Sequence, residues 1–315
     1  MSGNYPFEHP LTLVVPHGRG GSTDTAVRIV TRNAKMHLGV PVRVLNLAGI
    51  NGSFALNLMV DSIIAKSDGY SLSTANSSII LSPMVGVTKY CYMDEIKPIA
   101  MSAQAPFFLA VPKQAPWATL EELIADAKQN PGSISYGHSG VGNVSFVIAV
   151  LFELLAEIEL SAVSCNSGRE LADLAADVPN LCLFSNGVDL KEQLERGEVR
   201  VLAVAGYERS TRAEYSNAPT FLERGLNIVA YLRQGIGVSH DIPEEAYRLL
   251  VSAFEKMICD PETVTLLEEA GMDFCYKNGE DYYKLWQSER LRWDKALSMG
   301  VREKIKESIK KNMQS

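Results

Sequence analysis

Short apolar runs alternate along the chain with longer segments in which apolar residues recur at helical spacing. The runs are five to eight residues long and rich in Val, Leu and Phe, a pattern typical of buried strands. They are LTLVVP (11–16), VRVLNL (42–47), SLSTAN (71–76), FFLAVP (107–112), SISYG (133–137), LSAVSCN (160–166), LCLFSN (181–186) and VRVLAVAG (199–206). Between them, segments such as LEELIADAKQN and VIAVLFELLAEI predict helices. The repeated strand–helix order predicts an α/β fold with parallel sheets between helices.

From about Pro243 the pattern becomes helical. PEEAYRLLVSAFEKMI, PETVTLLEEAG and a long stretch from Glu280 to about Lys311 each place apolar residues along one helical face. We interpret these segments as structural helices that pack on a domain surface.

Small polar and glycine residues follow the predicted strands. The segments are PHGRGGSTD, NLAGING, TANSS, YGHSGVGNVS, CNSGR and FSNG. Ligands of open α/β sheets bind beyond the carboxyl ends of the strands, so these segments predict a binding cleft.

The first such segment, VVPHGRGGSTD (14–24), interrupts an apolar strand with three glycines and precedes a predicted helix over Ala26–Leu38. Glycine lets a ligand approach the main chain, and the free N–H groups at a helix start favour an anion. The spacing does not fit a dinucleotide turn, and the chain contains no P-loop pattern. An anion site and a plain turn capped by Ser22, Thr23 or Asp24 both remain open.

The segment YGHSGVGNVS repeats this design, with a strand, a glycine-rich turn and a helix that begins near Asn143 to Ser145. Two such turns could present backbone amides to the same carboxylate. A hydrogen bond to a charged group contributes roughly 1.5–3 kcal/mol, so three or four could supply micromolar affinity, about −8 kcal/mol.

Composition limits the class of partner. The chain has 315 residues, 21% charged and 46% hydrophobic, with a net charge of −7, which suits a globular protein of one large or two smaller domains. The most basic stretch, Lys304–Lys311, is interrupted by glutamate, so we expect no nucleic-acid partner. No run of 18 apolar residues occurs, so we expect no insertion into a membrane. The acidic surface is compatible with a monomer.

The N-terminal residues MSGNYPFEHP lack the charged and apolar regions of a signal peptide. This leaves open a cytosolic protein and an exported protein without its leader. Five cysteines occur without a C-x-x-C pair, so no zinc or redox motif is indicated. In an exported protein, Cys165 and Cys182 lie on predicted strands and could be paired.

Catalytic patterns are incomplete. ISYGHSGVGN has Val141 where the nucleophile elbow G-x-S-x-G requires its last glycine. A hydrolase or transferase that uses Ser139 with His17 or His138 stays as the alternative function. The five histidines lack the spacing of a metal site. We therefore expect a binding protein without catalysis, metal or cofactor.

Taken in order, several segments resemble the Bug-type solute-binding proteins of tripartite tricarboxylate transporters, over nearly the whole chain. LTLVVPHGRGGSTD resembles the family's first strand and P-P-G-G-x-x-D loop, and NLAGING resembles its N-x-x-G-A-G-G segment. DGYSL (68–72) matches D-G-Y-T-L, and NPGSISYGHSGVGN is similar to N-P-G-K-L-x-Y-G-S-x-G-x-G. RVLAVAGYERSTRAEYSNAPTFLERGL resembles the later R-x-L-A-V and P-T-x-x-E-x-G stretch.

The resemblance implies a two-lobed fold of the periplasmic binding protein type II kind. Residues 1–104 and 232–315 would form the first lobe and residues 105–231 the second, closing on an organic carboxylate. The acid could be a dicarboxylate, a tricarboxylate or an aromatic acid. Export and delivery to the membrane permease subunits of the transporter are also implied, and a sensory partner of a signalling system is a further possibility.

The family's ligand contacts can be carried over by position. In the first lobe they point to His17, Gly18, Arg19, Gly20, Gly21, Ser22, Thr23, Asp24, Asn76 and Ser77. In the second lobe they point to His138, Ser139, Gly140, Gly142, Asn143, Asn166, Gly168, Ser185 and Asn186.

The first loop departs from the family, which commonly has proline at position 19 and proline or an aromatic residue at position 17. Arg19 and His17 give this loop additional positive character. One hypothesis is that Arg19 recognises a second carboxylate, because a guanidinium can bind a carboxylate in a bidentate manner. The alternative is that Arg19 points into solvent.

Overall fold

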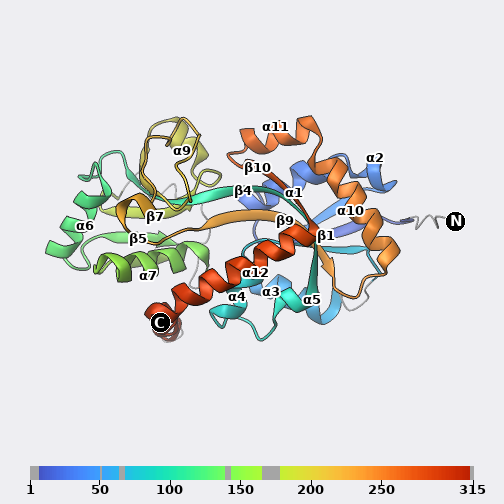
Figure 1. The fold of residues 1–315 in the computed structure, drawn as a ribbon, viewed down its shortest axis with the longest axis horizontal. Helices are drawn as coiled ribbons and strands as arrows, with labels where there is room; N and C mark the ends of the chain where they lie inside the picture. The colour runs from blue at the N-terminus through green and yellow to red at the C-terminus, as the bar shows by residue number, and fades with distance from the viewer. Residues whose placement is uncertain (1–6, 50–51, 64–67, 139–142, 165–177, 313–315) are drawn as a thin grey trace. The chain divides into compact units, whose positions relative to one another are not determined.

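The computed structural model describes residues 7–49, 52–63, 68–138, 143–164 and 178–312 (Figure 1). The chain forms two compact units. Unit 1 comprises Met1–Gln104 and Arg233–Trp293, and unit 2 comprises Ala105–Leu232 and Asp294–Ser315.

Unit 1 is built on strands that lie early and late in the chain. Its strands are β1 (Leu11–Val15), β2 (Val42–Asn46), β3 (Ser71–Thr74), most of β9 (Tyr231–Ser239), β10 (Asp273–Asn278) and the first part of β4 (Ile96–Pro112). Its helices are α1 (Ser22–Thr31), α2 (Ala34–Leu38), α3 (Ser53–Leu58), α4 (Ser78–Met84), α5 (Tyr92–Glu95), α10 (Glu244–Ile258), α11 (Pro261–Glu269), most of α12 (Gly279–Ala296) and the π-helical turn η2 (Met59–Ile63).

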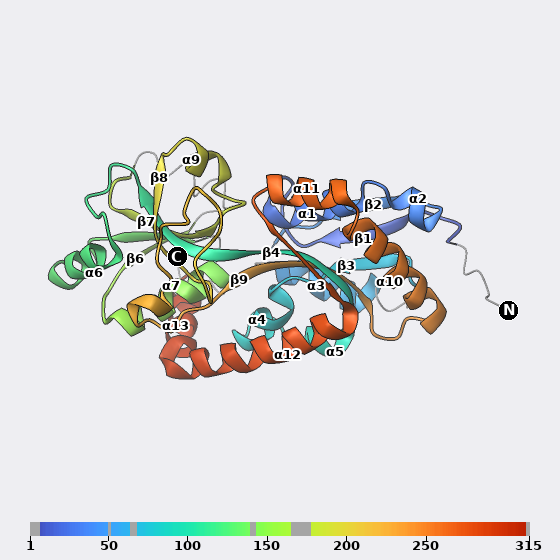
Figure 2. The same ribbon diagram turned by 45° about the horizontal axis from the view of Figure 1, so that its top comes forward.

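In unit 1, β1 lies between β2 and β3 and is parallel to both. β9 pairs with β3 and β10 with β4, in both cases antiparallel. Helices α1 and α11 cover one face of the β1–β3 sheet, and α3 and α4 lie on the other (Figure 2). The carboxyl ends of the three parallel strands therefore meet at one edge, and the loops that follow them come together there.

Unit 2 contains the rest of β4 and the strands β5 (Ser135–His138), β6 (Ser161–Ser164), β7 (Leu181–Asn186) and β8 (Val199–Val204). Its helices are α6 (Leu120–Gln129), α7 (Val144–Ala156), α9 (Lys191–Glu195), α13 (Arg302–Asn312), the 3-10 turn η4 (Leu222–Arg224) and the π-helical turn η5 (Leu297–Val301).

In unit 2, β5 is parallel to β6 and β7, whereas β4 pairs antiparallel with β7 and β8. Helix α7 packs against β5 and β7, and α13 packs against α7. A buried cluster that includes Phe108, Leu183 and Tyr215 forms part of the core.

The predicted α/β class is confirmed, with mixed rather than purely parallel sheets. Several boundaries differ from the sequence prediction. The helix predicted over Ala26–Leu38 begins earlier and divides into α1 and α2. The helix predicted from Glu280 to about Lys311 breaks at Gly300, whose φ of +97° suits glycine.

The C-terminal segment from Asp294 groups with unit 2, whereas sequence analysis assigned it to the first lobe. Its apolar side chains Leu297, Val301 and Ile305 are fully buried, and η5 and α13 contact α7 of unit 2. Lys304 Nζ also lies 3.7 Å from the carboxylate of Glu153 on α7. Of the two cysteines considered for pairing, Cys182 is a buried free thiol and Cys165 lies outside the described residues.

Candidate functional site

The loop after β1 ends at the start of α1, where no side chain of the described residues provides a cap. The N-cap of α1 is Gly21, so the expected caps Ser22, Thr23 and Asp24 lie within the first helical turn. The first intrahelical bond of this helix start is donated by Thr25 to the carbonyl of Gly21. Within the described part of the chain, no acceptor receives the backbone N–H of Ser22 or Thr23. These donors are therefore available to an anion.

The glycines of this loop leave open space beside the main chain. Gly20 has φ +79°, a conformation that L side chains rarely adopt. Among the described residues, a Cβ added at Gly18 or Gly20 would meet no atom within 4 Å, and at Gly21 it would meet only the carbonyl oxygen of Gly18, at 3.7 Å. A small ligand can thus approach the backbone here.

Asp24 holds the loop in this shape. Its carboxylate accepts hydrogen bonds from the Gly20 N–H at 2.9 Å, from Arg28 Nε at 2.9 and 3.0 Å, and from Asn46 Nδ2 at 2.9 Å. Burial alone would raise the pKa of the Asp24 carboxyl, but these hydrogen bonds outweigh burial and lower it. The buried carboxylate thus stays ionised, and its charge is paired with Arg28.

Asn46, at the end of β2, joins the loop to this ion pair. Its Nδ2 donates to the carbonyl oxygen of His17 at 3.1 Å as well as to Asp24, and its Oδ1 accepts from Arg28 Nη2 at 3.0 Å. Asn46 is the first residue of the NLAGING segment, but it was not predicted as an individual site residue. Its position at a strand end was the available signal.

His17 lies between the loops that follow β2 and β3. Its Nε2 is 3.4 Å from Nδ2 of Asn76, and a Cβ added at Gly52 would lie 3.3 Å from its Cε1. Gly52 has φ +85° and so needs glycine on both conformational and steric grounds. Desolvation of the half-buried imidazole lowers the pKa of His17 from 6.5 to about 4.

The other predicted site residues of unit 1 differ in their exposure to solvent. Arg19 is exposed, and no carboxylate of the described residues pairs with it. Asn76 and Ser77 are buried at the start of α4. Ser22 is half-exposed, whereas Thr23 is buried.

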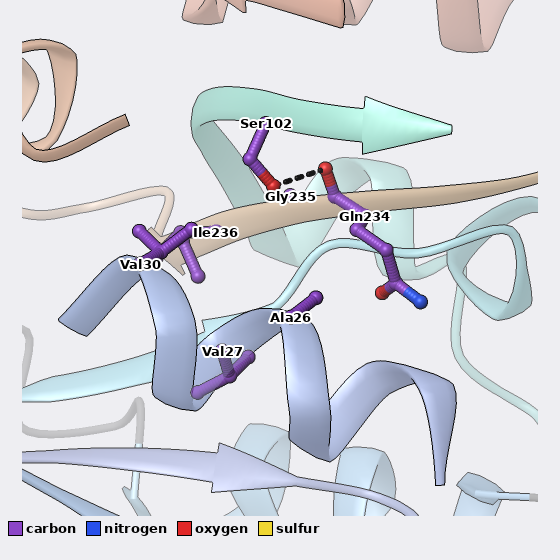
Figure 3. Close-up of a pocket in the computed structure, with 7 residues that line it drawn as sticks. All are labelled: Ala26, Val27, Val30, Ser102, Gln234, Gly235 and Ile236. Atoms are coloured by element: carbon purple, nitrogen blue, oxygen red, sulfur yellow. Dashed lines mark hydrogen bonds between the residues drawn. The ribbon is translucent and has the colours of Figure 1, made fainter. Parts of the chain in front are cut away.

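Thr23 is contacted by a residue that sequence reasoning missed. Nε2 of the buried Gln234, on β9, lies 3.4 Å from Thr23 Oγ1. Figure 3 shows the Gln234 amide pointing away from Ser102, whose hydroxyl bonds the Gln234 carbonyl oxygen at 3.2 Å. The gap between α1 and β9 in this view, lined by Ala26, Val27, Val30, Ser102, Gln234, Gly235 and Ile236, is too small to hold a water molecule. It is a packing gap and not a ligand pocket.

Two buried hydroxyls of unit 1 have no hydrogen-bond partner among the residues that the structure describes. They are Ser53 Oγ, which follows Gly52, and Thr74 Oγ1, at the end of β3. Buried polar atoms are normally satisfied, so these two are available to ordered water.

In unit 2, the described site residues are His138, Asn143, Ser185 and Asn186. His138 is buried, and its ring lies 4.9 Å from that of Phe146 in an edge-on contact. Asn143 caps α7, accepting from the Phe146 N–H at 2.9 Å, which confirms the predicted helix start.

Ser185 and Asn186 are buried at the end of β7. Asn186 accepts from the N–H groups of Val188 and Asp189 and donates to the Asp189 carboxylate at 2.8 Å. The remaining predicted residues of this unit, Ser139, Gly140, Gly142, Asn166 and Gly168, lie outside the described residues.

Two features are absent from the described ranges. They contain no group of three His, Cys, Asp or Glu side chains that could hold a metal ion. Among the same residues, no helix is both long and apolar enough to cross a bilayer.

Comparison with known proteins gives one consistent result. A family model described as the tripartite tricarboxylate transporter family receptor matches residues 26–299. BugT of Bordetella pertussis is 29% identical over 232 residues, which cover 70% of this chain and 67% of BugT.

Solved structures share the fold. A Rhodopseudomonas palustris protein with adipate is 25% identical, with 94% of this chain and 98% of that chain covered and a TM-score of 0.83. MatC of Rhodopseudomonas palustris, with bound malate, is 22% identical, with 92% and 99% covered and a TM-score of 0.80.

Proposed function

Because the chain belongs to the tripartite tricarboxylate transporter receptor family, whose members are periplasmic solute-binding proteins, we propose that it captures a small organic dicarboxylate. The receptor role follows from the family. The ligand class, the binding residues and the transporter partner are our proposal. A hydrolase that uses Ser139 would be foreign to a family of receptors.

The uncapped start of α1 carries the proposal. Its backbone donors at Ser22 and Thr23 lack acceptors among the described residues, and the glycines before them leave the main chain open. Asp24 would repel an anion if its charge were free, but Arg28 pairs with it. Donors, the helix dipole and a neutralised acid together favour a carboxylate at this place.

Arg19 supports a second carboxylate. Its side chain is exposed directly before the glycine pair Gly20 and Gly21, and no described carboxylate holds it in an ion pair. A guanidinium binds a carboxylate through two parallel hydrogen bonds, so a diacid could engage the amides with one end and Arg19 with the other. Adipate and malate, found in two solved relatives, are both dicarboxylates.

The site residues of unit 2 are proposed to add affinity for the same acid. Ser185 and Asn186 lie at the end of β7, and Asn143 at the start of α7, where parallel strands commonly present ligand contacts. The sequence adds the glycine-rich segment with His138, Ser139, Gly140 and Gly142, and the residues Asn166 and Gly168. Alanine at Ser185 should therefore weaken binding without changing which acid is preferred.

A calorimetric comparison of adipate with hexanoate tests the ligand class, because the two have equal chain length and differ by one carboxylate. Wild type should bind adipate more tightly by about tenfold or more, since a hydrogen bond to a charged group contributes roughly 1.5–3 kcal/mol. In Arg19→Ala this preference should largely disappear. Arg43→Ala, which removes an exposed arginine on β2, is the matched control and should keep it.

Two results would contradict the proposal. Equal affinity of the wild type for both acids would show that the protein does not recognise a second carboxylate. A ligand at 100 times its Kd stabilises a protein by about 2.7 kcal/mol. If no acid of a wider carboxylate panel gives binding heat or thermal stabilisation, the proposed binding function is wrong.

Delivery to the membrane permease of the transporter completes the proposed function. The family description links the receptor to such a transporter. Uptake of the bound acid into permease-containing vesicles should require the loaded protein, and uptake at the same rate without it would contradict this role.

A further inference from the structure

The orientation of the Asn76 amide is fixed by the backbone of α4. Its Oδ1 accepts a hydrogen bond from the N–H of Ser78 at 3.0 Å. The opposite orientation would bring the amide NH2 against this N–H, donor against donor. The NH2 of Asn76 therefore faces His17, with its Nδ2 3.4 Å from His17 Nε2.

This orientation determines the tautomer of His17. An amide NH2 can only donate, so the Nε2 that it faces must be the acceptor of a neutral imidazole. The ring proton then lies on Nδ1. In the described part of the chain, no acceptor receives a hydrogen bond from His17 Nδ1.

The surroundings of the ring favour this neutral form. The His17 ring is desolvated, which lowers its pKa to about 4. Gly52 brings the loop after β2 close to the Cε1 edge of the ring, which fixes the ring between two loops. His17 also directly precedes Gly18, the first glycine of the loop with open space beside its main chain.

We infer that His17 is a specificity-determining residue whose Nδ1–H, directed by Asn76, donates to an oxygen atom of the bound acid. The inference rests on the proposed function and narrows its substrate class. A fixed donor can bind an acceptor oxygen, such as that of a carboxylate or hydroxyl. A ligand ammonium would instead bring two donors together and would place a second positive charge near Arg19. The preferred ligands are therefore hydroxy or unsubstituted acids and not amino acids.

Malate and aspartate form the test pair, because they differ by a hydroxyl in place of an ammonium group. By calorimetry, wild type should bind malate at least about tenfold more tightly than aspartate, the scale of one hydrogen bond to a charged or polar partner. His17→Phe, which introduces an aromatic residue, should weaken malate binding and reduce the ratio toward unity. His37→Phe, a substitution at a half-buried histidine on α2, should retain the wild-type ratio.

Nitrogen NMR of the imidazole rings tests the tautomer without any ligand. The His17 signals, identified by their loss in His17→Phe, should show a protonated Nδ1 and an unprotonated Nε2 at pH 7. A protonated Nε2 would overturn the inference, as would an unchanged malate-to-aspartate ratio in His17→Phe. If neither acid nor any other carboxylate binds, the proposed function and the ligand contact both fail, while the ring signals still decide the role of Asn76.

Discussion

The backbone N–H of Gly20 donates a hydrogen bond to Oδ2 of Asp24 at 2.9 Å and closes the loop between β1 and α1. Asp24 is almost completely buried, so this contact and those of Arg28 and Asn46 replace its water shell. We propose that Asp24 acts as a positioning residue, which shapes the backbone donors of the loop.

Replacing Asp24 should therefore affect both stability and binding. Asp24→Ala should lower the free energy of unfolding by about 2–4 kcal/mol, because Arg28, Asn46 and the Gly20 N–H lose a common charged acceptor. Asp24→Asn keeps one acceptor oxygen and should cost less. Urea unfolding and calorimetry with the preferred acid check these effects, and an Asp24→Ala variant with unchanged affinity would contradict the positioning role.

The effect of Gly20 on stability, which comes from its left-handed conformation, can be tested separately from its effect on ligand binding. Gly20→Ala should cost about 1 kcal/mol, because φ +79° disfavours any L side chain. Gly39 at the end of α2 has φ +78° and equally open surroundings, so Gly39→Ala is a matched control. Both variants should lose similar stability, but only Gly20→Ala should lose affinity for the acid. Equal affinities would show that the ligand does not approach the loop backbone.

The lowered pKa of His17 predicts how stability depends on pH. The folded-state pKa is about 4 and the ordinary value is 6.5, so between these values the unfolded chain binds the extra proton. The contribution of His17 is complete above pH 6.5 and is lost progressively as the pH falls toward 4. From pH 7.5 to pH 5, wild type should lose more unfolding free energy than His17→Phe. Equal losses measured by urea unfolding would place the pKa of His17 near its ordinary value.

A buried ion pair in unit 1 gives a further prediction. Nε of Arg233, on β9, lies 2.8 Å from Oε1 of Glu289, on α12, and their side chains are only 7% and 4% exposed. Gln104 and Arg292 also belong to this network. Glu289→Ala should cost about 3–5 kcal/mol, because it removes the carboxylate that balances the charge of a buried guanidinium. Replacing Arg233 and Glu289 together with Met and Leu should cost less than the two single changes summed, and simple additivity would contradict the coupling.

Local patterns predicted much of the region around the first loop. β1 and the glycine-rich turn could be anticipated because strand alternation and glycine conformation depend on residues close in sequence. The start of α1 was misplaced, because Gly21 serves as its N-cap in place of a polar side chain. The partners of Thr23 and Asp24 were also missed. Gln234 is 211 positions from Thr23 and Asn46 is 22 positions from Asp24.

Two long strands were predicted incompletely for a similar reason: β9 was missed, and β4 was predicted too short. β9 contains Gly235 and Gly237, which weaken a strand pattern. The structure shows why glycine is present, since a Cβ at Gly235 would lie 2.4 Å from Cε1 of Tyr282 and one at Gly237 would lie 2.5 Å from Ile96 Cγ2. The first part of β4 contains Pro98 and lacks apolar alternation, although nearly all of it is buried. Close packing between distant segments leaves no periodic pattern in the sequence.

The most direct test of carboxylate binding at the start of α1 is an NMR titration of backbone amides with the diacid that stabilises the protein most. The amide signals of Gly21, Ser22 and Thr23 should shift in proportion to the bound fraction, and the shifts should be absent with the corresponding dimethyl ester. If the diacid saturates the protein and these three signals do not move, the carboxylate is not bound by the amides of this helix start.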